Sequence, residues 1–348
     1  MSLKNSLKNI EQNITKIKDE KEKKIKNFII DLIKYYKDLN KSEDKKESNA
    51  FEFNILSKRD LMINMSFTTE YMIKLYGPEL YITTVELDSI KREALFLRFH
   101  QIRSSSRTKM VNWMMEIFAS YSSEPLTFFL AVEIMDNYLQ KSKKIFNEKD
   151  LRLIGMVCMY MTSKMEDIIP LHMVHIKTKI GHDKFSKELI IMMERDILKT
   201  MDWDILLITT YDVMKTFLSD FYVNNRDMIN NLKMEIICYD LEIISIFLCK
   251  LISLHEGFFK YNKCIIAISI IIAAFDILRS NYKMSKEAEN FLRQWLLFLV
   301  KESNFHVDNV TNVYNKVCAF YEDIETINKI APSLCRLYNL RDLIKEIK

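Results

Sequence analysis

The sequence predicts an all-α protein. Its 348 residues include only four glycines and four prolines, so few tight turns or sharp breaks are available. Apolar residues recur at intervals of three and four, the period of a helix, and seldom at every second position as in a half-buried strand. With 49% hydrophobic residues, a chain of this length favours two or three packed units over one.

Residues 1–50 form a lysine-rich segment with a predicted helix over 3–39 and a polar linker over 40–50. Its thirteen lysines and nine acidic residues account for the whole net charge of +4. The apolar stripe has heptad spacing from Leu3 to Ile17 and is then shifted by about one residue, which predicts a coiled-coil-like helix. A partner helix, self-pairing or docking on the body of the protein would each bury this stripe.

Residues 51–103 show a mixed pattern, and five predicted helices follow them. The serines of "RSSSR" are N-cap candidates for the first helix. Pro125 suits the first turn of the second helix, while Asn147 and Ser186 are N-cap candidates for the third and fifth. The predicted helices span 106–121, 125–141, 147–166, 171–180 and 186–202.

Two predicted helices rich in small residues stand about 110 residues apart. The first reads "DLRLIGMVCMYMTSK", and "KCIIAISIIIAAFDIL" repeats its character from Lys263 onward. Each follows an amphipathic helix, which indicates a weakly repeated helical unit with a boundary near residue 208. The apolar run at 264–275 is shorter than the roughly 20 residues that span a bilayer, so we expect a buried core helix and no membrane partner.

Catalytic and cofactor motifs are missing from the sequence. It contains no GxGxxG or Walker loop to bind phosphates, and no GxSxG, HRD or DFG. His255-Glu256 begins an HExxH zinc motif, but Phe259 stands where the second histidine belongs. The pair His172 and His175 lacks a third ligand nearby in sequence. We therefore expect a non-enzyme with no catalytic residue, no metal and no cofactor.

The distribution of cysteines and charges excludes two further classes of protein. None of the six cysteines forms a CxxC pair, and most lie in apolar helical runs, which is typical of reduced, buried thiols inside a cell. Beyond residue 50, 38 basic groups balance 38 acidic groups. This balance argues against a direct nucleic-acid partner, because such modules concentrate basic charge on their folded face.

Four stretches between residues 104 and 208 match one known family in form, order and spacing. "SRTKMVNWMME" resembles the family's opening helix, MRxxLVDWLVE, and "LAVEIMDNYL" resembles the next helix, LAVNxxDRFL. "LRLIGMVCMYMTSKMEDIIP" resembles the third helix, LQLVGxxxxxxASKxEExxP, and "MMERDILKTMDWDI" resembles the fifth, RMExxxLxxLxFDL. Together these forms make up the cyclin box. The chain thus resembles the cyclin family, nearest its mitotic A/B-like group.

The resemblance implies two tandem cyclin-box domains of five helices each, preceded by a helical N-terminal extension. Residues 104–208 would form the first box, and residues 209–348, which match only in pattern, the second box and a tail. Residues 51–103 would pack on the first box. In function, the resemblance implies a regulatory subunit that forms a heterodimer with a cyclin-dependent protein kinase and activates it in cell-cycle control. Its expected location is the nucleus, the cytoplasm or both.

Four residues match family positions that contact the kinase. Lys164 matches the lysine that caps kinase backbone carbonyls, and Glu194 matches the glutamate that works beside it. Met165 and Leu198 match apolar positions of the same kinase-binding interface. A charge in so apolar a helix is unfavourable unless it is paired or meets a partner. The alternative for Lys164 and Glu194 is therefore an ordinary intramolecular salt bridge.

Two other charged residues match a family pair with a structural role. Arg107 matches the arginine of the opening helix, and Asp136 matches the aspartate of the next helix to which it is tied. Removing one member of a buried pair leaves the other charged and without a partner. We therefore expect substitution of either residue to unfold the box.

The first helix carries two apolar stripes, although one core needs only one. The stripe predicted to face the core consists of Val111, Met114, Met115 and Phe118. The other stripe resembles the exposed patch by which many cyclins dock substrates and inhibitors that carry RxL-type motifs. The predicted members of this patch are Met110, Trp113, Glu116, Leu151 and Arg152.

The predicted docking patch departs from the family in three places. Ser106 and Lys109 replace apolar residues, and Arg152 replaces a glutamine, so the patch is smaller and more cationic. Such a patch would repel an arginine-bearing ligand, and an acidic docking motif is the hypothesis that follows. Cover of Trp113 by the N-terminal segment is the alternative.

Two other functions remain open for a protein of this pattern. A cyclin-fold scaffold like the transcription factor B family would need a basic surface and often an N-terminal zinc ribbon, but the first cysteine is Cys158. A cyclin-fold adaptor that activates no kinase is the second. The joint presence of Lys164 and Glu194 speaks against such an adaptor.

Overall fold

The computed structural model describes residues 96–281, 284–303 and 305–321. These residues fold into helices, and the described part of the chain holds no strand beyond the isolated bridge between Gln101 and Asn147. The all-α prediction is confirmed. The predicted N-terminal helix, the linker over 40–50 and all but the last eight residues of 51–103 lie outside the described residues.

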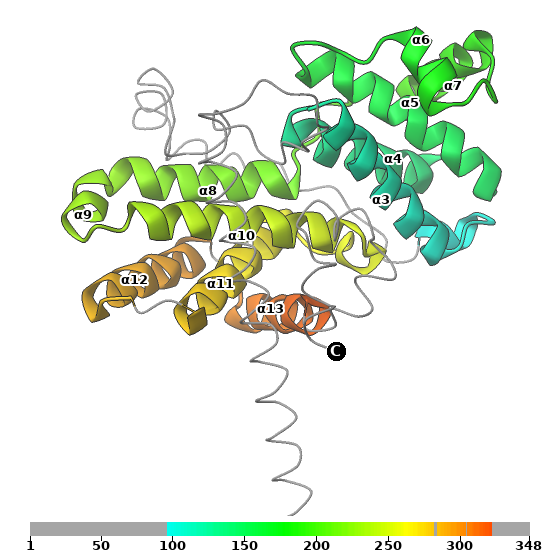
Figure 1. Ribbon diagram of the computed structural model, residues 1–348. Helices are drawn as coiled ribbons and strands as arrows, with labels where there is room; N and C mark the ends of the chain where they lie inside the picture. The colour runs from blue at the N-terminus through cyan, green and yellow to red at the C-terminus, as the bar shows by residue number, and fades with distance from the viewer. Residues whose placement is uncertain (1–95, 282–283, 304, 322–348) are drawn as a thin grey trace, which may run out of the picture.

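The helices form two groups that lie side by side (Figure 1). The first group consists of η2 (Phe96–Phe99), α3 (Ser104–Ser120), α4 (Pro125–Lys141), α5 (Glu148–Glu166), α6 (Met173–His175), the π-helical turn η3 (Ile176–Ile180) and α7 (Lys187–Thr200). The second group consists of α8 (Thr210–Asn224), α9 (Arg226–Asn231), α10 (Glu235–Ser253), η4 (Glu256–Phe258), α11 (Lys263–Asn281), α12 (Lys286–Glu302) and α13 (Val307–Tyr321).

Helix α5 is the centre of the first group, and small residues allow its neighbours to approach. It contacts α3, α4 and α7. A Cβ atom on Gly155 would stand 2.0 Å from Cε of Met110, so the tip of this α3 methionine occupies the space that a side chain would need. The glycine in the middle of the helix is therefore explained by close packing and not by a turn.

Helix α11 is the centre of the second group. It contacts α8, α10, α12 and α13, and its small residues Ala267, Ser269, Ala273 and Ala274 are fully buried. The Ser269 hydroxyl donates to the carbonyl of Val310 in α13 at 3.2 Å, a contact that needs closely packed backbones. The prediction of a buried core helix over 264–275 is confirmed. Among the described helices, none combines the length and the apolar character needed to cross a bilayer.

Local signals fix most helix starts. Asn147 forms a full capping box with Asp150 at the start of α5, and Ser186 accepts from the Leu189 amide at the start of α7. Pro125 occupies the first turn of α4. The Asn147 and Ser186 side chains accept from first-turn amides that would otherwise have no hydrogen-bond partner. Pro125 has no N–H group, so it leaves no such amide unpaired. These three start predictions are confirmed.

The prediction of a serine N-cap for α3 is wrong. The helix begins at Ser104, and Arg103 takes the N-cap position without a side-chain cap. Ser106 lies inside the first turn, where its hydroxyl donates to the Glu148 carboxylate at 2.8 Å. Contact with the start of α5 thus decides the geometry of this turn, because it gives the hydroxyl a charged acceptor.

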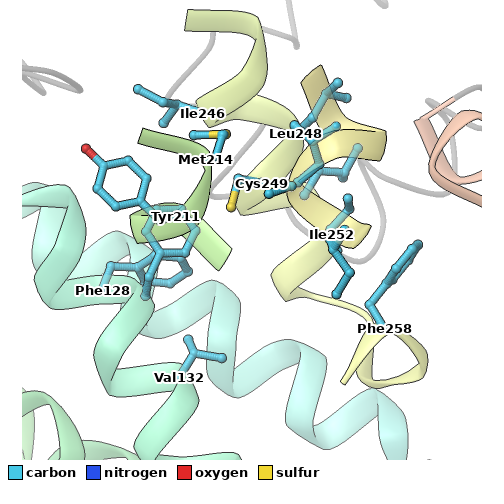
Figure 2. Packing of buried hydrophobic residues seen from close by; sticks show 14 of the residues in the cluster. Phe128, Val132, Tyr211, Met214, Ile246, Leu248, Cys249, Ile252 and Phe258 are labelled. Atoms are coloured by element: carbon cyan, nitrogen blue, oxygen red, sulfur yellow. The ribbon is translucent and has the colours of Figure 1, made fainter. Parts of the chain in front are cut away.

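The two groups share one continuous core. Figure 2 shows Phe128 and Val132 of α4 close to Tyr211 of α8, with side chains of α10 beyond them. Phe129 of α4 stacks on Tyr211 with ring centroids 4.8 Å apart. Apolar burial of this kind stabilises each group against the other.

Candidate functional site

Lys164 and Glu194 lie at the end of the first helix group where α5 and α7 meet. Lys164 is in the last turn of α5, and its ammonium forms a salt bridge with the Glu194 carboxylate of α7. The lysine side chain is 39% exposed and the glutamate 19%. The ammonium also lies 4.2 Å from the Tyr160 ring centroid, a cation–π contact that fixes its position. The structure thus brings the two predicted residues together at the surface.

Apolar side chains flank this pair on both helices. Met165 and Leu198 are half-buried and pack against the core. Four further residues of these segments are strongly exposed, and sequence reasoning missed them. They are Ile168 (87%), Ile169 (81%), Met192 (64%) and Trp203 (68%). We call these four residues, with Lys164, Met165, Glu194 and Leu198, the α5–α7 surface.

Asp167 holds the turn that carries the two exposed isoleucines. Its carboxylate accepts from the hydroxyl of Ser163 at 2.6 Å and from the hydroxyl of Thr127 in α4 at 2.6 Å. The Ser163 hydroxyl in turn accepts from the Leu171 amide at 2.8 Å. Ile168 and Ile169 therefore project from a turn anchored on both sides and not from a loose loop.

Trp203 is fixed by the end of α7. Its amide donates to the carbonyl of Leu198 at 2.8 Å, and both Asp202 and Trp203 have left-handed backbone with φ of 53° and 64°. Left-handed backbone is uncommon for such residues and is found mainly where the surrounding structure imposes it. The apolar letters within "EDIIP" and "MDWDI" are the sequence signal that could have found these exposed residues.

Arg107 and Asp136, which match a family pair, form a buried salt bridge between α3 and α4. Nε donates to Oδ1 at 2.8 Å and Nη2 to Oδ2 at 2.5 Å, and both side chains are 3% exposed. Burial raises the pKa of the Asp136 carboxyl, while the guanidinium opposes this shift. Arg107 Nη1 also donates to the carbonyls of Ser253 and Leu254, so the pair lies where the first group meets the second.

A groove of about 310 Å³ lies between α3 and the start of α5. Of the predicted docking-patch residues, Met110, Trp113, Leu151 and Arg152 line it, whereas Glu116 does not. Trp113 is half-buried and has the Arg152 guanidinium 5.0 Å from its ring centroid. The predicted core stripe of α3 is buried, but Met110 of the stripe expected to be exposed is buried as well, at 6% exposure. A docking role for this stripe stays a prediction. Whether the N-terminal segment covers Trp113 concerns residues outside those described.

The buried thiols and the histidines offer no further site. Burial raises the pKa of the Cys238 thiol to about 12 and raises those of Cys158 and Cys249 as well, which keeps these thiols protonated and unreactive. Within the described ranges, no three histidine, cysteine or acidic side chains converge where a metal ion could be held.

Comparison with known proteins points to one family. The family model "Cyclin, N-terminal domain" matches residues 80–206, which include both the α5–α7 surface and the groove. The chain is 28% identical over 167 residues to Cyclin-A1-4 of Oryza sativa subsp. japonica, covering 43% of this chain and 46% of that protein. It is 27% identical over 206 residues to the G2/mitotic-specific cyclin C13-1 of Daucus carota, an alignment that covers 58% of this chain and 56% of that protein. The alignments span about half the length of these relatives.

A solved structure shares the fold. A viral cyclin from herpesvirus saimiri superposes with a TM-score of 0.51 at 20% sequence identity, over 71% of this chain and 98% of that one. At this identity the likeness concerns the fold alone. The relatives include both A-type and B-type cyclins, among them Cyclin-B1-1 of Arabidopsis thaliana at 31% identity over 117 residues, or 34% of this chain and 27% of that protein. Residues 80–206 thus match the cyclin N-terminal domain, and the chain is similar to A-type and B-type cyclins.

Proposed function

We propose that this chain acts as a cyclin, the regulatory subunit of a cyclin-dependent protein kinase, and that it binds the kinase through the α5–α7 surface. The observation that carries the proposal is the Lys164–Glu194 salt bridge, which stands at the surface where α5 and α7 meet. Exposed apolar residues occur on α7 and in the turns that follow α5 and α7. The similarity to cyclins supports the proposal, since cyclins are regulatory subunits and not enzymes themselves.

The composition of the α5–α7 surface supports a protein partner. Large apolar side chains such as Ile168 and Met192 are strongly exposed, and burying them against a partner would remove apolar surface from water. A stable interface combines a buried apolar centre with a few oriented polar groups. Because Asp167 anchors the isoleucine-bearing turn and α7 anchors Trp203, little ordering of this surface would oppose binding.

The charged pair would supply the oriented polar groups. An ammonium has three N–H donors, and Glu194 is the acceptor for one of them. The remaining donors can reach backbone carbonyls of a partner, as the matching family lysine does. The phosphoryl-transfer chemistry would remain in the kinase, where a Lys–Glu ion pair and a metal-binding aspartate must be brought into place. The cyclin would act by stabilising the kinase conformation in which these groups are aligned.

Affinity purification of the full chain from its own cells, followed by a protein kinase assay, tests this proposal. The test variant is Lys164→Glu/Glu194→Lys, which keeps an intramolecular pair but exchanges the charges shown to a partner. We expect the wild-type chain to capture kinase activity and the exchanged variant to capture none while it remains folded. Capture of the same activity by the exchanged variant would contradict the role of this surface.

Lys144→Glu is the matched control. Lys144 is also an exposed lysine that pairs with a carboxylate of α7, Asp196, at 2.5 Å, but it does not belong to the α5–α7 surface. This variant should keep its kinase activity. No kinase with either the wild type or the control would favour an adaptor or a scaffold like transcription factor B. A kinase-binding role would place the protein in the nucleus, the cytoplasm or both.

A further inference from the structure

Two lysines and a tyrosine converge in the second group, where α13 packs beside the start of α11. Lys260 and Tyr261 belong to the connection between η4 and α11, whereas Lys316 lies on α13, 55 positions after the tyrosine. The Lys316 ammonium donates a hydrogen bond to the Tyr261 hydroxyl. The Lys316 and Lys260 ammonium groups lie 4.8 and 5.0 Å from the centroid of the Tyr261 ring. One phenol thus brings together two cations from separate elements.

These two cations have no carboxylate partner in the part of the chain that the structure describes. Both lysine side chains are exposed, and neither forms a salt bridge with a described acidic residue. The exposed Lys144 differs in this respect, because its ammonium pairs with Asp196. Two like charges held beside one phenol repel each other, and an anion bound between them would remove this repulsion.

The phenol and the start of α11 add further attraction for an anion. Tyr261 is half-buried, and burial raises its pKa, but the Lys316 hydrogen bond and the charge of Lys260 outweigh burial and lower the pKa. Because Lys316 donates to the hydroxyl oxygen, the O–H group of Tyr261 remains a donor. Tyr261 directly precedes Asn262, which caps α11, and the first turn of this 19-residue helix holds no acidic residue. The positive end of the helix dipole therefore lies beside the two lysines.

We propose that Lys260, Tyr261 and Lys316 form a binding site for a phosphate group, which we call the phosphate site. The two ammonium groups would pair with phosphate oxygens, and the phenol O–H would donate to a third oxygen. A phosphate ester carries about 1.5 to 2 negative charges at pH 7 and has three acceptor oxygens, which matches two cations and one neutral donor better than a carboxylate does. The phosphate site shares no residue with the α5–α7 surface, so it does not depend on the proposed kinase-regulatory function.

Isothermal titration of the full chain tests the proposal with three probes. The probes are inorganic phosphate, a phosphoserine peptide and the same peptide with an unmodified serine. We expect the phosphoserine peptide to bind at least about tenfold more tightly than the unmodified peptide. Tighter binding of the phosphoserine peptide than of inorganic phosphate would assign the site to a phosphorylated protein, and equal affinity would assign it to free phosphate. Absence of binding by both phosphate-bearing probes would overturn the proposal.

The variant Lys260→Ala/Lys316→Ala locates the binding. We expect it to lose at least about tenfold in affinity for the phosphoserine peptide, and Tyr261→Phe, which keeps the ring but removes the donor, to lose less. The matched control is Lys286→Ala/Lys301→Ala, which removes the same charge from exposed positions of α12 and should bind as the wild type does. Equal affinity of the phosphorylated and unmodified peptides, or an affinity unchanged in Lys260→Ala/Lys316→Ala, would contradict the phosphate site.

An acidic segment of the chain itself is the competing occupant. Glu322, Asp323 and Glu325 follow α13 and lie outside the described residues. We expect the variant Glu322→Gln/Asp323→Asn/Glu325→Gln to bind the phosphoserine peptide as the wild type does. If the peptide binds only to this variant, carboxylates of the chain fill the site in the wild type, and the proposal of an external phosphate is wrong.

Discussion

Arg107 donates a hydrogen bond to the backbone carbonyl of Leu254, a residue 147 positions later in the chain, at 3.2 Å. The same guanidinium donates to Ser253 at 3.1 Å and pairs with Asp136. Leu254 follows the last residue of α10, and the carbonyls at this end of the helix lack helical partners. The Thr108 hydroxyl also donates to the Leu254 carbonyl, at 3.0 Å. Arg107 of α3 therefore connects α3 to α4 through Asp136 and also caps the C-terminal end of α10 in the second group.

Arg107→Ala should destabilise both groups at once. The substitution leaves the Asp136 carboxylate buried without its partner and frees the carbonyls at the end of α10. We expect a loss of about 3–5 kcal/mol in the free energy of unfolding, measured by urea denaturation followed by circular dichroism. Arg103→Ala, which removes an exposed pair four residues earlier, should change the midpoint little. Comparable midpoints for the two variants would contradict the role given to Arg107.

Gly155→Val should overpack the centre of the first group. A Cβ at this position would stand 2.0 Å from Met110 Cε and 2.9 Å from Met114 Cε, so both methionine tips must move. We expect a destabilisation of about 1–3 kcal/mol. In a double-mutant cycle with Met110→Ala, measured by thermal unfolding, the combined effect should be smaller than the sum of the two. Simple additivity would show that the two residues do not compete for space.

Glu194→Gln should separate binding from stability. The Lys164–Glu194 salt bridge is partly exposed, so its loss should lower the free energy of unfolding by at most about 1 kcal/mol. At an interface, loss of a central charged contact weakens binding by about 2–5 kcal/mol. Isothermal titration with the captured kinase, beside urea denaturation of the free chain, measures both quantities. A large loss of stability would show that the pair is mainly structural.

Much of the fold could be predicted from the sequence because the signals are local. Capping by Asn147 and Ser186, Pro125 in a first turn, and helical spacing along α3 depend on residues within one or two turns. The serine N-cap predicted within "RSSSR" is wrong for a tertiary reason. The Ser106 hydroxyl donates instead to the carboxylate of Glu148, which lies 42 positions later in the chain. The range predicted as one helix over 171–180 is a short α6 followed by a π-helical turn.

The residues of the candidate sites likewise fall into those that the sequence could predict and those that depend on tertiary contacts. Family motifs pointed to Lys164 and Glu194, and the structure brings them together. Exposure of Ile168 and Trp203 could not be predicted, because an apolar residue in a turn is usually assigned to the core, and only the Asp167 anchor and the end of α7 hold these side chains outward.

By itself, the sequence determined that this protein is helical, where three of its helices start, which two helices are rich in small residues and which family it resembles. These properties depend on periodicity, capping and motif spacing, all of which are carried by short stretches of chain. The tertiary structure alone decided that Arg107 caps α10, that Glu148 is engaged by Arg103, and that Arg152 stacks on Trp113 without a counter-ion. Each of these contacts joins residues about 40 to 150 positions apart, where only packing of the helices determines which charges meet.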